Sequence, residues 1–461
     1  MSGFSGEIIW RGEPGYEDAR VGRVFNARRP ERYPAAVLLA QNEEDVIAGV
    51  RLARARGLKV SVRSGGHSWA AWSLRDEALL IDLGRMRDMT FEPASGIATV
   101  NPAVQGGTEL TPFLSSHGAA FPGGHCPSVG LGGFLLQGGQ GWNSRRYGWA
   151  CERVVAIDVV TADGQLVHAD EAQNTDLLWA ARGAGPGFMG VITRFYLRTY
   201  PLPKAMTHDT WMFELAELEH LLAWIDELLP SLDRVVEPVI AATRVPRPQG
   251  PPVLLLHTTA MCESEQEAER VLAPLAACPL ADRAIGHERG PTTVEAENDA
   301  QGAQNPEGYR YAADCTWTDA RGPELAPLLR NLWSQLPTEH SFSIWYGWSP
   351  NRELPDMAFS VEGRAYVATY AIWPDAADDE HHQQWVVDHT RRLAELGKGV
   401  YLGDTDFIRR SDRFLSDENF ARLEQVRARR DPEGRFCSYL IAPGAQLNAG
   451  PARRPHTGSA P

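Results

Sequence analysis

Two glycine-rich segments each carry a side chain that can act as a nucleophile. Residues 63–68 read RSGGHS and contain His67, and residues 121–142 read FPGGHCPSVGLGGFLLQGGQGW and contain Cys126. A neutral imidazole and a thiolate are good soft nucleophiles near neutral pH. Glycine lets a backbone approach a ligand closely, and successive N–H groups of such loops can bind a phosphate. The two segments together predict a bound ligand, whereas either one alone could be a tight turn.

The familiar phosphate-binding and metal-binding spacings are absent from these segments. Neither contains the GxxxxGK[ST] pattern of a P-loop, and neither opens a helix with a GxGxxG fingerprint. His125 stands directly beside Cys126, a spacing unlike that of zinc ligands. We therefore expect no metal site, and we expect His125 to cap its loop or to line the ligand.

The elements that must position these loops form a mixed α and β pattern. Residues 36–40 predict a strand, the periodic apolar residues after them predict a helix, and residues 59–62 predict a strand that ends at RSGGHS. This is a β-α-β unit. Further strands are predicted at 78–84, 96–101 and 190–203, with a hairpin at Asp163-Gly164.

The second half of the chain has a different pattern, in which helices alternate with strands typical of an antiparallel sheet. Helices are predicted at 218–232, 324–337 and 378–396, strands at 252–261, 341–348 and 364–373, and a loop at 240–252. The fold class is therefore α+β. We divide the chain into residues 1–205, 206–407, 408–445 and a mobile polar tail at 446–461.

Composition limits the partners of the protein. The 461 residues are 43% hydrophobic and 23% charged, as in globular proteins, and the net charge of −14 argues against nucleic acid as a partner. No segment has the length and hydrophobicity of a membrane span or the pattern of a signal peptide. The six cysteines show no disulfide-like spacing. We therefore expect a cytoplasmic protein that does not bind membranes.

An ordered series of segments resembles the FAD-linked oxidases of the berberine-bridge-enzyme type, in the vanillyl-alcohol-oxidase superfamily with its PCMH-type FAD-binding domain. These segments are SVRSGGHS, LLIDLGRM, FPGGHCPSVGLGGFLLQGGQGWNSRRYG, VVAIDVVTADGQLVHA, NTDLLWAARGAGPGFMGVITRF and RRDPEGRF. The resemblance implies that residues 1–205 and 408–445 bind FAD. It also implies that residues 206–407 form a substrate domain, an antiparallel sheet with helices on one side.

The same resemblance implies that FAD is held by two covalent bonds. His67 would bond the 8α-methyl carbon of the flavin through an imidazole nitrogen, and Cys126 would bond C6 as a thioether. The remaining cofactor contacts that the resemblance implies are Arg63, Ser64, Gly65, Gly66, Ser68, Gly130, Gly132, Gly133, Gly138 and Val191.

The activity that the resemblance implies is the oxidation of a small molecule. A tethered flavin would take a hydride from an alcohol, a sugar, an amine or a carbon next to a phenol, and O2 would reoxidise it to give H2O2. The alternatives are a dehydrogenase, an oxygenase or an oxidative cyclase of a secondary-metabolite pathway, and a flavin-binding protein without catalysis.

Each turnover also needs a base that removes a proton from the substrate. Tyr401 stands where relatives carry the tyrosine of a Tyr-x-Asn segment, and Asp404 is the alternative. Further candidates are Tyr346, Glu362, Tyr309 and Tyr311, with Arg310 or Arg364 as the cation that would lower the pKa of a tyrosine.

Overall fold

A computed structural model of the chain describes residues 4–245, 247 and 249–450. Its first sheet places the RSGGHS segment at the end of a strand. The strands of this sheet, in spatial order, are β1 (Glu7–Trp10), β2 (Ala36–Leu39), β4 (Leu79–Asp82) and β3 (Val60–Arg63). The last three run parallel and β1 is antiparallel to β2. The predicted strands are confirmed, but β2 and β3 are not neighbours, because β4 pairs between them.

Helix α2 (Glu43–Ala55) connects β2 to β3 and covers this sheet. It begins after Asn42, whose side-chain oxygen accepts a hydrogen bond from the backbone N–H of Asp45 at 2.9 Å, as an N-cap residue does. Val46 and Val50 lie one helical turn apart and are fully buried against the sheet. The helix therefore fixes the position and direction of β3, and with them the start of the loop that carries His67.

A second, antiparallel sheet supports the other glycine loop. Its strands, in spatial order, are β5 (Met89–Glu92), β6 (Ile97–Val100), β10 (Val191–Arg198), β8 (Val154–Val160) and β9 (Leu166–Ala169). The predicted hairpin at Asp163-Gly164 is the β8–β9 connection. The long strand predicted at 190–203 is wrong in part, because the chain leaves the sheet at Thr199. That residue bonds the carbonyl of Gly96, and β11 (Tyr200–Pro201) then pairs with β7 (Ala119–Ala120).

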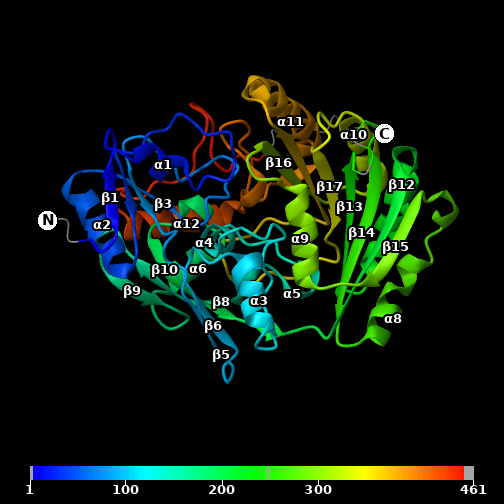
Figure 1. Ribbon diagram of the computed structural model, residues 1–461, viewed down its shortest axis with the longest axis horizontal. Helices are drawn as coiled ribbons and strands as arrows, with labels where there is room; N and C mark the ends of the chain where they lie inside the picture. Colours follow the sequence, from blue (N-terminus) through cyan, green and yellow to red (C-terminus); the bar gives the residue numbers. More distant parts are fainter. Residues whose placement is uncertain (1–3, 246, 248, 451–461) are drawn as a thin grey trace, which may run out of the picture.

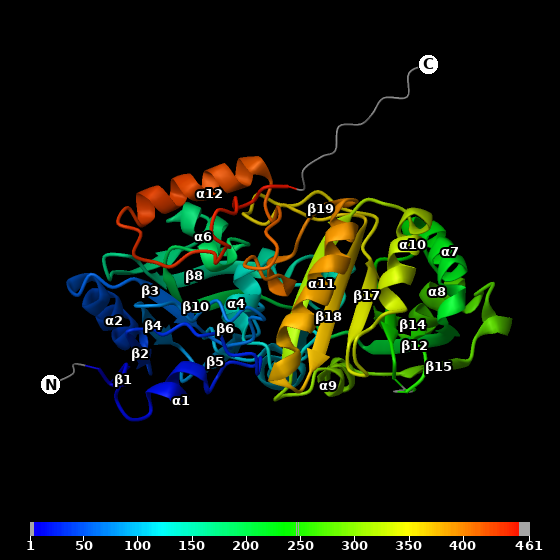
Figure 2. The ribbon, with the colours of Figure 1, turned by 90° about the horizontal axis from the view of Figure 1, so that it is seen from above.

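Short helices and one long helix fill the space around these sheets. They are α1 (Tyr16–Val21), α3 (Thr111–Ser115), α4 (Leu131–Leu136), α5 (Ser144–Tyr147), α6 (Thr175–Ala181) and α12 (Asp417–Arg430). Helix α4 follows directly on the loop that carries Cys126. The α12 helix comes from the end of the chain yet lies beside α6, where Arg430 forms an ion pair with Asp176 (Figure 2).

The rest of the chain forms one large sheet in which every neighbouring pair is antiparallel. In spatial order its strands are β15 (Gly286–Pro291), β12 (Ala205–Glu214), β14 (Val253–Cys262), β13 (Val236–Thr243), β17 (Phe342–Gly347), β18 (Ala365–Trp373), β16 (Arg310–Thr318) and β19 (Gly397–Gly399). The loop predicted at 240–252 begins later than expected, because β13 continues to Thr243.

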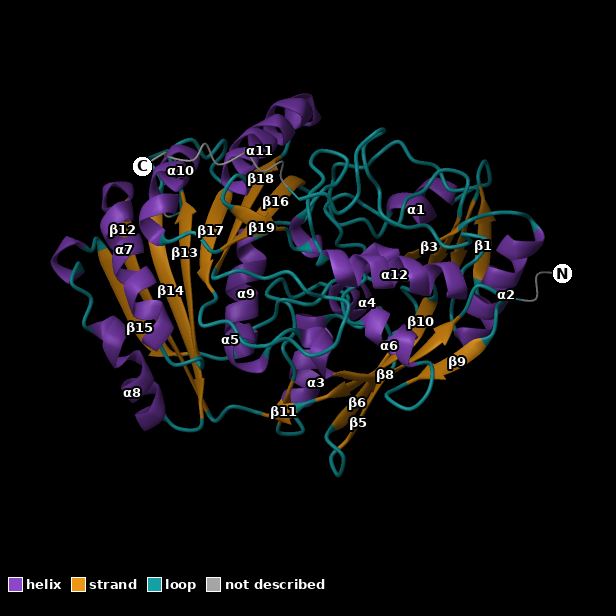
Figure 3. Cartoon of the chain, turned by 180° about the vertical axis from the view of Figure 1, so that it is seen from behind, coloured by secondary structure: helices purple, strands orange, loops and turns teal. Residues whose placement is uncertain are grey.

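Four helices cover the outer face of this sheet (Figures 2 and 3). They are α7 (Leu218–Leu228), α8 (Glu265–Ala276), α10 (Gly322–Trp333) and α11 (Asp379–Ala394). The apolar sides of α7, α8 and α10 share one core with the strands. The fifth helix, α9 (Val294–Gln304), lies on the inner face, between the sheet and α3 (Figure 1). The sequence analysis missed α9 because its segment has no apolar stripe.

The chain returns to the first sheet after α12. The backbone N–H of Val60 donates to the carbonyl of Arg435, and the N–H of Cys437 donates to Val60. Asn448 is buried and accepts hydrogen bonds from the N–H groups of Phe414 and Leu415 at 2.9 and 3.0 Å. Within the tail predicted to be mobile at 446–461, Asn448 is thus held by the protein, and the mobility of the segment stays a prediction. Its last part, 451–461, lies outside the described residues.

Arg145, on α5, joins the two halves of the molecule. Its guanidinium is buried and donates to the backbone carbonyls of Asp233 at 3.1 Å and Ser349 at 2.8 Å. These acceptors lie in two loops at one end of the large sheet. Among the described residues, no helix is long and apolar enough to cross a membrane.

Candidate functional site

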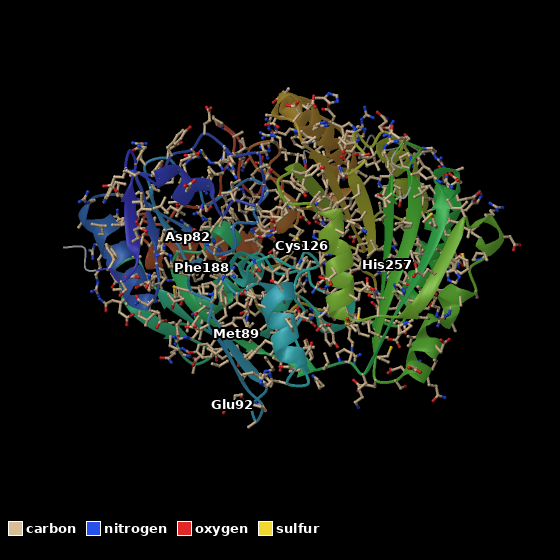
Figure 4. All side chains as sticks on the ribbon, in the orientation of Figure 1. Asp82, Met89, Glu92, Cys126, Phe188 and His257 are labelled. Atoms are coloured by element: carbon tan, nitrogen blue, oxygen red, sulfur yellow. The ribbon has the colours of Figure 1, made fainter. Side chains whose placement is uncertain are left out.

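A cavity of about 730 Å³ lies between the two glycine loops and the inner face of the large sheet. This volume falls within the range of small-molecule and cofactor sites. Figure 4 labels three residues of its lining, Cys126 from the second loop, Phe188 from the segment before β10 and His257 from β14. The cavity therefore brings the glycine loops and the strands of the second half to one place.

His67 reaches the cavity from the loop after β3. Its ring stacks on Phe25, with the centroids 4.2 Å apart, and its Nε2 lies 2.9 Å from the hydroxyl oxygen of Ser128. Burial lowers the pKa of His67 to about 4. The imidazole is therefore neutral at pH 7, the form in which a ring nitrogen has a lone pair for attack.

Cys126 lines the same cavity, two residues before Ser128. Burial raises the pKa of the Cys126 thiol, and a hydrogen bond with Ser128 opposes this shift. The thiol is therefore protonated at neutral pH in the protein alone, and a base has to accept its proton before it can react as a thiolate. Ser128 therefore bonds His67 and follows Cys126 by two residues, and it was not predicted from the sequence.

The glycines of the two loops allow their backbones to touch. A Cβ atom on Gly65 would lie 2.6 Å from the backbone nitrogen of Gly130, and a Cβ on Gly130 would lie 2.7 Å from the Cα of Gly65. Gly132 is packed against Ser64 in the same way. Ser64, Gly65, Gly66, Ser68, Gly130, Gly132 and Gly133 all line the cavity. The loops thus form a cradle that a side chain at Gly65 or Gly130 would disrupt.

Three of the predicted cofactor contacts are placed differently. The guanidinium of Arg63 is buried and bonded to Asp82 and to the backbone carbonyls of Ala19 and Arg20, although the residue borders the cavity. Gly138 does not line the cavity. Val191 does not line it either, since its side chain packs in the core of the first sheet, while the adjacent Gly190 and Ile192 do reach the cavity.

Tyr401 and Asp404 both line the cavity. The hydroxyl of Tyr401 accepts a hydrogen bond from the backbone N–H of Gln140 at 3.3 Å. The carboxylate of Asp404 accepts from three neutral donors, Trp69 Nε1 at 2.9 Å, Tyr366 OH at 2.6 Å and Tyr370 OH at 2.8 Å. Burial raises the pKa of Tyr401, and the negative charge of Asp404 raises it further. Tyr401 is therefore a phenol at neutral pH.

The other predicted base candidates are divided between the cavity and the protein interior. Tyr346 lines the cavity, and burial raises its pKa. Glu362 lies elsewhere, where its carboxylate accepts hydrogen bonds from the indoles of Trp149 at 3.0 Å and Trp348 at 3.1 Å. Glu362 therefore holds two tryptophans in place. Neither Tyr309 nor Tyr311 lines the cavity.

The two arginines expected to activate a tyrosine are bound to acids instead. Arg310 pairs with Asp379, and Arg364 pairs with Asp226 at 2.7 Å. Neither arginine lines the cavity. No guanidinium of the second half therefore lowers the pKa of a cavity tyrosine, as far as the structure describes the chain.

Sequence reasoning missed most of the polar residues on the strands that line the cavity. His208, Glu237, His257 and Thr259 point from the inner face of the large sheet, and Glu297 points from α9. The signal was present in β14, where His257 and Thr259 stand at alternate positions of a mostly apolar segment. Side chains at alternate positions share one face of a strand. Polar side chains on a buried face of a sheet are candidates for a functional role.

Comparison with known proteins agrees with the geometry. The FAD binding domain family matches residues 34–170, which contain both glycine loops. The FAD-linked oxidoreductase janO of Penicillium janthinellum is 35% identical over 442 residues, which cover 94% of this chain and 98% of that protein. The chain belongs to the FAD-linked oxidoreductases. Its FAD-binding domain contains His67 and Cys126.

Two further proteins resemble this FAD-linked oxidoreductase in fold or in part of the sequence. Its fold matches that of BBE-like 1 from Physcomitrella patens with a TM-score of 0.82 at 18% identity, over 96% of this chain and 98% of that chain. The carbohydrate oxidase of Microdochium nivale is 38% identical over 186 residues, which cover 40% of this chain and 37% of that protein. The resemblance to the berberine-bridge-enzyme type and the α+β fold class are confirmed.

Proposed function

We propose that this FAD-linked oxidoreductase is an oxidase that binds its flavin covalently through both His67 and Cys126. The single observation that carries this proposal is that both side chains line one cavity, with Ser128 bonded to His67 and two residues from Cys126. The two residues are 59 positions apart in the sequence. Two nucleophiles that meet beside a glycine cradle suit a cofactor with two electrophilic positions on one edge.

The residues present fit the flavin in both shape and chemistry. The backbone contact between Gly65 and Gly130 leaves the loops without side chains at their crossing, so that a flat ring and a pyrophosphate can lie against the backbone. The neutral imidazole of His67 has the lone pair that bond formation requires. When bound, FAD would accept a hydride from the substrate and return the two electrons to O2 as H2O2.

The residues of the chain would handle the proton of the substrate. An alcohol that becomes a carbonyl loses a hydride from carbon and a proton from oxygen. We propose that Asp404 accepts this proton, directly or through the hydroxyl of Tyr370, because Asp404 is a carboxylate beside the cavity with three neutral donors. Tyr401 would orient the substrate oxygen as a hydrogen-bond donor. Of the other candidates, Tyr346 would bind substrate, and Glu362 has no part in the chemistry.

The test of covalent attachment is the mass of the acid-denatured protein. Wild-type protein should retain FAD after denaturation and should be yellow. His67→Ala and Cys126→Ala should each retain it through the other bond, and the double variant should lose it. A wild-type protein that releases all its flavin in acid would contradict this proposal.

The test of oxidase activity is peroxide production with a substrate panel of sugars, alcohols and amines. Steady H2O2 formation at the rate of O2 consumption is expected. A flavin that is reduced by substrate but reacts with O2 slowly, and reduces a dye instead, would identify a dehydrogenase. The name of the Microdochium nivale relative, a carbohydrate oxidase, makes carbohydrates the first members of the panel.

A further inference from the structure

A row of polar side chains crosses the inner face of the large sheet, opposite the glycine loops. His208 on β12 stands opposite Thr259 on β14, which stands opposite Glu237 on β13. Tyr346 on β17 pairs with Val239, two residues from Glu237 and therefore on the same face. His208, Glu237, Thr259 and Tyr346 all line the cavity. We call this set the polar row.

The polar row is buried but incompletely bonded. Glu237 is 3% exposed, and its Oε1 accepts a hydrogen bond from His125 Nε2 at 3.0 Å. Among the described residues, Glu237 Oε2, Thr259 Oγ1 and the Tyr346 hydroxyl make no hydrogen bond of normal geometry, and Tyr346 lies close enough to Glu237 for the negative charge of Glu237 to raise the pKa of its hydroxyl beyond the effect of burial. Buried polar atoms in proteins are nearly always bonded to protein, water or ligand. Three such atoms on neighbouring strands of one cavity wall point to a ligand group.

The charge of the cavity indicates what kind of group this is. The second half of the chain contributes Glu237, Glu297 and Asp404 to the lining, together with the exposed Glu288, and no lysine or arginine within the described residues. The arginines in the lining, Arg63 and Arg75, come from the first half and donate to Asp82 and to backbone carbonyls. Histidines at 125, 208 and 257 contact Glu237 and Glu297.

Asp404 adds to this negative charge, because its three partners are neutral and the described residues provide it with no ion pair. A carboxylate or phosphate on the substrate would therefore meet a wall of like charge. A hydroxyl or a protonated amine on the substrate would instead donate a hydrogen bond to Glu237 Oε2, which has no such bond of normal geometry within the described part of the protein. Phe342 and Tyr370 stack beside the row and offer an apolar surface to the rest of the molecule.

We propose that Glu237, with Tyr346 and Thr259, binds a hydrogen-bond-donating group of the substrate and restricts this oxidoreductase to substrates without a negative charge. This inference rests on the proposed oxidase function and names the substrate class of that site. The donating group can be a hydroxyl or a protonated amine. The affinity for a protonated amine should depend more strongly on the negative charge of Glu237 than the affinity for a hydroxyl does.

The experiment uses three probes of one shape, benzyl alcohol, benzylammonium and benzoate. Each is titrated into the purified flavin-containing protein, and binding is followed by the change in the flavin absorption spectrum. We expect benzylammonium to bind most tightly, benzyl alcohol more weakly, and benzoate at least tenfold more weakly than benzylammonium. In Glu237→Gln, which keeps the shape, the affinity for benzylammonium should fall about tenfold to a hundredfold, and that for benzyl alcohol by less.

The matched control is Glu288→Gln, which removes one negative charge from the exposed rim of the same cavity. It should change each dissociation constant by less than about threefold, because exposed charges are screened. Tyr346→Phe provides a second variant, because it removes one hydroxyl of the polar row. It should weaken the binding of benzyl alcohol more than the binding of benzoate.

The proposal is overturned if benzoate binds as tightly as benzylammonium, if none of the probes changes the flavin spectrum, or if Glu237→Gln behaves as Glu288→Gln does. Flavin retention in acid and reoxidation by O2 after reduction with dithionite are measured on the same samples. Those two measurements test the oxidase proposal. A failure of that proposal can therefore be distinguished from a failure of the proposal that the polar row binds substrate.

Discussion

Nε2 of His67 lies 2.9 Å from the hydroxyl oxygen of Ser128, although the two residues are 61 positions apart in the chain. This contact joins the loop after β3 to the loop before α4. A serine hydroxyl can donate to one imidazole nitrogen or accept from it, so Ser128 fixes the orientation of the ring and helps to select its tautomer.

Ser128→Ala should therefore slow the formation of the bond to His67. We expect the fraction of flavin that survives acid denaturation to fall when Cys126 is also replaced by alanine, because His67 is then the single remaining attachment. Absorbance of the acid-precipitated protein measures this fraction. Ser116→Ala, a change at an exposed residue outside the cavity lining, is the control. Equal retention in both variants would contradict the role of Ser128.

Gly130→Ala should destabilise the protein and weaken flavin binding. Its new methyl group would lie 2.7 Å from the Cα of Gly65, and neither backbone can move without shifting its loop. Such overpacking costs about 1–3 kcal/mol of unfolding free energy. Thermal unfolding and the flavin content of the purified protein measure the two effects. In Gly286→Ala, where the nearest atom is 3.6 Å from the new methyl group, both should stay close to wild type.

Asp404→Asn should remove the proposed proton acceptor while it keeps the hydrogen bonds from Tyr366 and Tyr370. We expect the rate of flavin reduction by substrate, measured in the absence of O2, to fall about 10²–10⁴-fold, the range for loss of a general base. Flavin content should not change. Glu92→Gln, at the exposed end of β5 and far from Cys126 in Figure 4, is the control. A reduction rate within threefold of wild type would exclude Asp404 as the base.

His67, which is partly buried in the cavity wall, should make the flavin-free protein sensitive to acid. Its pKa is about 4 in the folded state and 6.5 in an ordinary environment. Between these values the unfolded chain takes up a proton that the folded chain does not. The contribution of His67 is therefore complete above pH 6.5 and is lost as the pH falls toward 4, by about 3 kcal/mol. Urea unfolding of flavin-free protein at pH 6.5 and 4.5 measures the loss, and His67→Asn should lose less over the same interval.

The glycine loops could be predicted from the sequence because their chemistry is local. His67, Cys126 and the glycines around them stand in continuous segments, and the strands next to them have clear apolar patterns. Tyr401 and Asp404 were also found, through their position in a short segment. Both reach the cavity.

The polar row could not be predicted, because its members meet through strand register. Glu237 and Thr259 are 22 residues apart, and only the pairing of β13 with β14 places them opposite one another. Glu362 was misplaced for a related reason. Its carboxylate resembled a candidate base in sequence, but the fold turns it toward the indoles of Trp149 and Trp348. Pairing between strands that are distant in the sequence decides where these side chains point, and a single sequence does not reveal that pairing.

Arg145 has a consequence for how molecules enter and leave. Its guanidinium is buried between the two halves of the molecule, where it donates hydrogen bonds to backbone carbonyl oxygens of two separate loops. These hydrogen bonds to a buried charge are worth about 1.5–3 kcal/mol each, so they oppose separation of the two halves at this end. We therefore expect substrates to enter the cavity without movement of the halves apart there, and a fixed opening to select against substrates that are too wide.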